Sequence, residues 1–108
     1  MIADYKLYLD DERFPKSSGW KIVRSYEEFI STVKERGVPS CISFDHDLGE
    51  GSLSGHECVK WLIHYGIEND IPVEEIEINV HSANPVGKEN IEKLFDSFVR
   101  FKKRDWNE

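Results

Sequence analysis

Apolar residues recur along this chain with two different periods, which predict strands and helices. Apolar runs over residues 5–10 and 41–45, and alternating apolar positions over 76–80, are typical of strands; residues 20–24 form a further strand-like segment. Apolar residues at helical spacing follow three helix-start signals, which are Ser25 to Glu28, Ser54 to Glu57 and Asn84-Pro85. The chain is therefore expected to run strand, strand, helix, strand, helix, strand, helix.

This order of elements predicts an α/β fold with a mostly parallel, four-stranded sheet. The continuous apolar run at 41–45 suits a strand that is covered on both faces, whereas the alternation at 76–80 suits an edge strand. Nine residues separate Asp10 from Trp20, fewer than a helical crossover usually needs. We therefore expect a reduced or missing first helix, and the first two strands pair either in parallel or antiparallel.

Three of the predicted strands run directly into polar residues. The polar segments are Asp10 to Arg13, Asp45 to Gly49 and His81 to Asn84. In an open parallel sheet, ligands bind in the crevice outside the carboxyl ends of the strands. These three segments are therefore expected to meet in one site.

Composition limits the kinds of protein that this chain can be. With 108 residues and 39% hydrophobic residues, residues 1–108 are expected to form a single domain. The formal net charge of −7 argues against duplex DNA as a partner, although a small nucleotide can still enter a local pocket. Cys41 and Cys58 lie in apolar surroundings without metal-ligand spacing, which predicts buried thiols in a reducing compartment. Neither a leader nor a membrane span is evident, so we expect a soluble, cytoplasmic protein with no membrane partner.

The acidic pair Asp10-Asp11, the strand-end Asp45 and Ser82-Ala83 resemble the receiver domains of two-component response regulators. The resemblance implies that such residues bind a divalent cation, accept phosphate and contact the phosphoryl group. Two departures stand out, namely the reduced first helix and the absence of a fifth strand carrying the Lys-Pro of receivers. Lys88 lies in the last predicted helix and is not assigned that role.

A wider set of motifs is more similar to the receiver-like family named for cyclic-phosphate processing. The matching segments are residues 7–13 (LYLDDER), 43–49 (SFDHDLG) and 81–87 (HSANPVG), so the resemblance spans nearly the whole chain. We expect a small, flavodoxin-like fold of three layers, in which no fifth strand is evident from the sequence. The resemblance also implies an enzyme that acts on a cyclic phosphate from RNA ends or ADP-ribose-type metabolites.

Four carboxylates are candidate metal ligands: Asp10, Asp11, Asp45 and Asp47. Hard oxygen ligands from two strand ends suit one Mg²⁺ or Mn²⁺. The alternative is that Asp10 and Asp11 begin a turn and that Asp47 serves the following loop. Asp45 is the strongest candidate, because a carboxylate that ends an apolar strand is otherwise costly to desolvate. Strand continuity aligns Asp45 with the receiver phosphoacceptor, while the spacing to Gly55 fits Asp47; we adopt Asp45.

Two histidines are candidate proton-transfer groups at the same site. The candidates are His46 and His81. An imidazole can both take up and release a proton in neutral water, so beside Asp45 one of them can take a proton from water while the other protonates the departing ester oxygen. The alternative is that either histidine serves hydrogen bonding or packing. That alternative is preferred for His56 and His64, which fall on predicted helix surfaces.

Four further residues are candidates for binding phosphate. Ser82 and Asn84 precede a helix start, where free N–H groups attract anions, and Arg13 and Lys88 can add charge-assisted hydrogen bonds. For Lys88 a solvated surface charge is the preferred interpretation. The aromatic residues Tyr8, Trp20 and Trp61 can stack a nucleobase, but core packing is preferred for them.

These observations predict a small phosphoesterase that opens a cyclic phosphate on a nucleotide, an RNA end or an ADP-ribose-type metabolite. A metal-independent phosphoesterase is also open, since a pair of histidines can catalyse the opening of a cyclic phosphate without a metal. The alternative is a noncatalytic or phosphoaccepting receiver-type domain, which the missing receiver Lys weakens. The sequence leaves the oligomeric state open.

Overall fold

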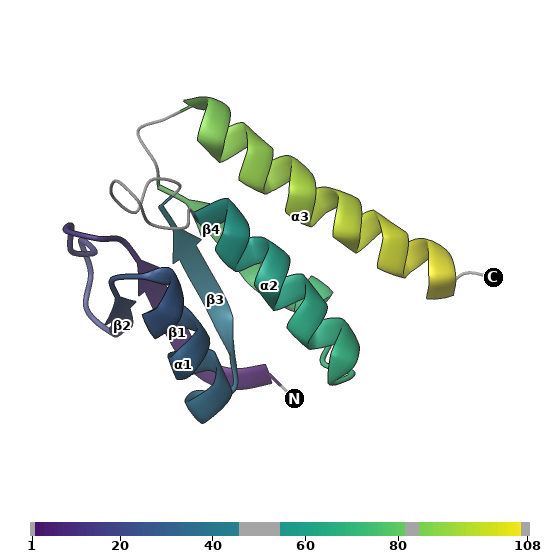
Figure 1. The fold of residues 1–108 in the computed structure, drawn as a ribbon, viewed down its shortest axis with the longest axis horizontal. Coiled ribbons are helices and arrows are strands. Elements are labelled where there is room, and N and C mark those ends of the chain that lie inside the picture. Colours follow the sequence, from purple (N-terminus) through teal and green to yellow (C-terminus); the bar gives the residue numbers. More distant parts are fainter. Residues whose placement is uncertain (1, 46–54, 82–84, 107–108) are drawn as a thin grey trace.

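The computed structural model describes residues 2–45, 55–81 and 85–106, which form four strands, three α-helices and one 3-10 turn (Figure 1). In chain order the elements are β1 (Ile2–Leu9), β2 (Trp20–Val23), α1 (Tyr26–Arg36), β3 (Val38–Phe44), α2 (Gly55–Glu68), η1 (Val73–Glu75), β4 (Glu77–Val80) and α3 (Pro85–Trp106). This confirms the predicted order of elements and the α/β fold class.

The four strands are arranged in the order β2-β1-β3-β4, and all three neighbouring pairs are parallel. Residues 10–19 join β1 to β2 without a helix, and the register then places Trp20 opposite Lys6. The first helix is therefore missing, and the pairing that the sequence left open is parallel. Among the described residues no fifth strand follows β4, which lies at the sheet edge as predicted.

Helix α1 begins with the predicted capping motif. The Ser25 hydroxyl accepts a hydrogen bond from the Glu28 amide at 3.1 Å, and the Glu28 carboxylate accepts one from the Arg24 amide at 3.0 Å. Gly37 ends the helix at φ 95°, a conformation that favours glycine, and its amide donates to the Val33 carbonyl at 2.8 Å. The expected caps Ser54 and Asn84 lie outside the described residues.

The core lies between the helices and one face of the sheet. Leu7 and Ile42 are fully buried on this face, and the rings of Phe44 and Phe29 lie 5.8 Å apart between β3 and α1. Figure 1 shows α1 and α2 over the same side of the sheet, and α3 packs beside α2. Three helices and a four-stranded parallel sheet are consistent with the predicted small, flavodoxin-like α/β fold. The β1–β2 connection, residues 10–19, contributes no helix to it.

The two cysteines and Trp61 lie in packed parts of the domain. Cys41 and Cys58 are both buried and free, as predicted. Burial raises the pKa of the Cys58 thiol, and the nearby carboxylates of Glu27 and Glu57 act in the same direction. Trp61 packs against Phe29 and stacks on Tyr65, which confirms a packing role for this aromatic residue. No described helix has both the length and the apolar character needed to cross a membrane.

Candidate functional site

Polar residues from three strands meet at the carboxyl edge of the sheet because the backbone ladder continues one residue beyond each strand. The Asp10 amide donates to the Val23 carbonyl at 3.1 Å, the Asp45 amide to Leu9 at 3.0 Å, and the His81 amide to Phe44 at 2.9 Å. These bonds fix the first polar residue after β1, β3 and β4. The predicted meeting of the three strand ends is therefore confirmed.

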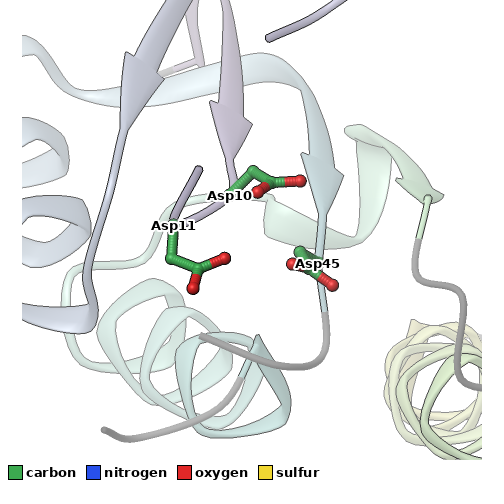
Figure 2. Close-up of side chains that lie close together, drawn as sticks. All are labelled: Asp10, Asp11 and Asp45. Atoms are coloured by element: carbon green, nitrogen blue, oxygen red, sulfur yellow. The ribbon is translucent and has the colours of Figure 1, made fainter. Parts of the chain in front are cut away.

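Asp10, Asp11 and Asp45 bring carboxylates together from two neighbouring strand ends (Figure 2). One oxygen from each residue lies within 4.8 Å of the others. Asp10 is fully buried and Asp45 is 4% exposed, whereas Asp11 is exposed. Buried carboxylates are rare without a compensating partner, so this cluster requires cations or hydrogen-bond donors.

The Asp10 carboxylate is held by four donors. Its Oδ1 accepts from the backbone amides of Glu12 at 3.0 Å and Arg13 at 2.9 Å, and its Oδ2 accepts from Arg13 Nε at 2.8 Å and His81 Nε2 at 3.0 Å. Burial alone acts to raise its pKa, but the two amides, His81 and the Arg13 charge together lower it. Asp10 is therefore ionised at neutral pH.

Arg13 bridges the two buried carboxylates. Its Nε donates to Asp10, and its terminal Nη2 lies 3.4 Å from Asp45 Oδ2. The side chain is 46% exposed, so the guanidinium reaches the buried pair from a partly solvated position. Burial acts to lower the pKa of Arg13, but the charges of Asp10 and Asp45 outweigh it and raise the pKa.

His81 uses both ring nitrogens within the protein. Nε2 lies 3.0 Å from Asp10 Oδ2, and Nδ1 lies 2.6 Å from the Ser43 hydroxyl oxygen. Because the ionised Asp10 can only accept, Nε2 carries the hydrogen, and in the neutral ring Nδ1 accepts from Ser43. The Tyr8 ring stacks on the imidazole at 4.3 Å with an interplanar angle of 7°. The imidazole is thus fixed on three sides.

Arg24 is a site residue that sequence reasoning missed. Its Nη1 donates to the backbone carbonyls of Asp10 at 3.0 Å and Arg13 at 2.6 Å, and its guanidinium lies over the Phe14 ring. It therefore clamps the turn that carries the acidic pair. No sequence pattern pointed to Arg24, since it directly precedes a helix cap and reads as surface charge.

Ser43 and Tyr8 were also missed as partners of His81, although a signal for them exists. Side chains in a strand alternate between faces, so Ser43 shares a face with Asp45, and Tyr8 shares one with Asp10. The parallel register places Tyr8 opposite Ser43. Applying the two-residue period to the strand ends would have identified both residues.

The structure places the remaining candidates as follows. His46, Asp47, Ser82 and Asn84 lie outside the described residues. Lys88 is exposed near the start of α3, and no contact within the described ranges joins it to Asp10 or Asp45. His56 is half-buried and His64 exposed on α2. Trp20 meets Tyr8 edge-on at 5.8 Å, with Lys6 over its ring.

The acidic cluster is a group of carboxylates that could hold a metal ion. Its three carboxylates supply hard oxygen atoms from two strand ends, and two of them are buried. Oxygen donors of this kind suit hard divalent cations.

A parallel α/β sheet with an acidic pair after β1 and a buried aspartate after β3 defines a receiver-like domain. The chain belongs to the family of cyclic-phosphate processing receiver domains, whose family model matches residues 5–97. No curated protein and no solved structure gives a significant match to the chain. The resemblance inferred from the sequence motifs is therefore confirmed.

Proposed function

We propose that this domain is a phosphoesterase that opens a cyclic phosphate carried by a nucleotide, an RNA end or an ADP-ribose-type metabolite. The observation that carries the proposal is the pair of buried carboxylates, Asp10 and Asp45, bridged by Arg13 at the strand ends. The family is named for cyclic-phosphate processing, which supports the substrate class. In the reaction water adds to phosphorus, one ring P–O bond breaks, and the departing oxygen takes a proton.

In this proposal Asp10, Asp11 and Asp45, together with Asp47, hold Mg²⁺ or Mn²⁺. A bound cation at such carboxylates supplies positive charge to the phosphate and activates water as a nucleophile. The protein contributes a rigid frame, because backbone bonds fix Asp10 and Asp45 at adjacent strand ends.

Arg13 is the proposed phosphate-binding group among the described residues. Its planar guanidinium matches the oxygen atoms of a phosphate, and it lies beside the carboxylates while remaining 46% exposed. Ser82, Asn84 and Lys88 complete the proposed phosphate contacts. The exposed position of Lys88 makes its contribution the weakest of these.

Proton transfer is assigned to His46 and His81, with different support for each. The contacts of His81 favour a role through Asp10, since its Nε2–H orients the carboxylate and Ser43 occupies Nδ1. A direct transfer from His81 to the ester oxygen requires Nε2 to leave Asp10 first. His46 adjoins Asp45 in the sequence and is the second proposed proton-transfer group.

The proposed partner is a small phosphorylated metabolite or an RNA end with a cyclic phosphate. The net charge of −7 disfavours duplex DNA, whose backbone requires clustered Lys and Arg. A cytoplasmic location without a membrane partner remains part of the proposal.

A receiver-type phosphoacceptor is the second candidate function. The observation that favours it is the position of Asp45, which directly follows β3 beside the acidic pair, as a receiver phosphoacceptor does. In that reaction the carboxylate attacks phosphorus of a phosphoryl donor, and the donor leaves with its bond electrons. Each chain then captures one phosphoryl group without turnover.

Phosphorus NMR of the purified protein tests both candidates. The panel contains 2′,3′-cyclic nucleotides, an oligonucleotide ending in a 2′,3′-cyclic phosphate and ADP-ribose cyclic phosphate, each with Mg²⁺, Mn²⁺ or chelator. The variants are Asp45→Asn and His81→Ala, and the matched control is Glu89→Gln on the exposed side of α3.

We expect repeated conversion of one substrate to a monoester, abolished by Asp45→Asn, reduced by His81→Ala and unchanged in Glu89→Gln. Loss of turnover with chelator would support the metal. The absence of conversion across the panel, with Mg²⁺-dependent labelling of Asp45 by acetyl phosphate, would overturn the phosphoesterase in favour of the receiver.

A further inference from the structure

Asp10 has no unused hydrogen-bonding capacity in its present arrangement. A carboxylate offers about four lone-pair positions, and Asp10 accepts from two backbone amides at Oδ1 and two side chains at Oδ2. Any further bond to this carboxylate must therefore displace one of the four donors. The same applies to a divalent cation that uses Asp10 as a ligand.

The four donors differ in how easily they can leave. The amides of Glu12 and Arg13 belong to a turn whose carbonyls Arg24 holds at both ends. His81 is fixed by Ser43 and by stacking on Tyr8, and its side chain is only 20% exposed. The Arg13 side chain is 46% exposed and rotates about several bonds, so it is the donor with the lowest cost of release.

Arg13 also lies where a positive charge can compensate the two buried carboxylates. Its guanidinium contacts Oδ2 of Asp10 at 2.8 Å and Oδ2 of Asp45 at 3.4 Å, so one positive charge serves both buried carboxylates. A divalent ion held by the same carboxylates would repel the guanidinium at this short range. The two cations therefore compete for one pair of carboxylates.

We propose that Arg13 is an exchangeable internal cation, which neutralises Asp10 and Asp45 when the metal is absent and turns to hold the substrate phosphate when the metal binds. This inference rests on the metal-dependent form of the proposed function and names the residue that couples metal binding to phosphate binding. Only the side chain moves, since the Arg13 amide stays on Asp10 and its carbonyl stays on Arg24.

If Arg13 exchanges with the metal in this way, removing its guanidinium should change the affinities for metal and for phosphate in opposite directions. Removing the guanidinium frees a coordination position on Asp10, so the protein should bind the metal more tightly. The same change removes a charge-assisted contact to phosphate, so anions should bind more weakly to the metal-loaded protein. A residue that only stabilised the turn would not shift the two affinities in opposite directions.

The test compares the wild-type protein with Arg13→Gln and with the control Arg100→Gln, which removes an exposed arginine paired with Asp96 on α3. Isothermal titration calorimetry measures Mg²⁺ and Mn²⁺ binding, and then binding of inorganic phosphate at saturating Mg²⁺. In parallel, the ¹H–¹⁵N signal of Arg13 Nε–H follows its hydrogen bond to Asp10 during the Mg²⁺ titration. Circular dichroism confirms that each variant is folded.

We expect Arg13→Gln to bind Mg²⁺ about tenfold more tightly and phosphate about tenfold more weakly, because charge-assisted hydrogen bonds have energies of this order. Arg100→Gln should match the wild-type protein, and the wild-type Nε–H signal should move toward that of a solvated arginine. Equal Mg²⁺ affinity in Arg13→Gln and the wild-type protein, or an Nε–H signal unchanged by saturating Mg²⁺, would overturn the exchange while leaving the metal site intact. If neither protein binds Mg²⁺ or Mn²⁺, the exchange and the metal-dependent form of the proposed function both fall.

Discussion

Nε2 of His81 lies 3.0 Å from Oδ2 of Asp10, and this hydrogen bond joins two strands that are not neighbours in the sheet. Asp10 follows β1, His81 follows β4, and β3 lies between them. The bond therefore spans the carboxyl edge of the sheet and links residues 71 positions apart in the chain. The orientation of the acidic site depends on a strand at the sheet edge.

Replacing His81 should destabilise the fold as well as impair the site. His81→Phe preserves an aromatic ring for Tyr8 but removes the hydrogen bonds to Asp10 and Ser43. We expect the free energy of unfolding to fall by about 1–3 kcal/mol, because buried polar groups lose their partners. Urea unfolding measures the change, with His64→Phe on the surface of α2 as the control. Equal stability of the two variants would show that the His81 contacts contribute little.

Asp10 should make stability depend on pH on the acid side. Its pKa is lowered in the folded protein, so its contribution is fully present above the unfolded-state value of about 4 and is lost as pH falls through the folded value. Unfolding free energies measured between about pH 2 and 7 should fall less steeply for Asp10→Asn than for the wild-type protein. Asp96→Asn, at an exposed position on α3, serves as the control. Parallel pH profiles for Asp10→Asn and the wild-type protein would contradict this assignment.

Arg24→Ala should loosen the turn that carries Asp10 and Asp11. The variant loses the bonds from Nη1 to the carbonyls of Asp10 and Arg13, which should cost about 1–3 kcal/mol of stability. Hydrogen exchange should show reduced protection of the Glu12 and Arg13 amides. Lys21→Ala, at an exposed position on β2, should leave these amides protected. Unaltered hydrogen exchange in Arg24→Ala would mean that the turn is stable without the hydrogen bonds from Arg24.

Gly66→Ala should destabilise the packing of α2 against η1. A Cβ at this position would overlap Cγ2 of Val73 and lie 3.2 Å from the Ile71 carbonyl oxygen. We expect a loss of about 1–3 kcal/mol from overpacking. Adding Val73→Ala should recover part of it, so chemical denaturation of the single and double variants should give non-additive changes. If the stability changes of the two single variants simply add up in the double variant, the contact between residue 66 and Val73 is not the cause of the destabilisation.

The sequence was informative wherever a local rule determines the structure. The Ser25 cap, the edge position of residues 77–80 and the arrival of Asp10, Asp45 and His81 at one sheet edge follow from capping, alternation and parallel strand geometry. The parallel pairing of β1 with β2 did not follow, because a connection of residues 10–19 permits either direction.

The long-range details of the site were not accessible from the sequence. The hydrogen bonds from Arg24 to the carbonyls of Asp10 and Arg13 depend on the path of the loop between β1 and β2. The use of both His81 nitrogens depends on Ser43 and Asp10, which belong to different strands. Predicting these hydrogen bonds requires knowing how the strands are aligned in the folded sheet. The polar residues at the strand ends, by contrast, can be recognised from the sequence alone.

The strand order has a consequence for how the chain can fold during synthesis. Of the four strands, β1 is made first and lies inside the sheet, β2 and β3 add on either side of it, and β4 adds last at the edge. The sheet can therefore grow outward in the order in which the ribosome delivers its strands. Asp10 and Asp45 come together once β3 has emerged, whereas His81 joins them only at the final strand, so the acidic site is assembled before the residue that locks its orientation.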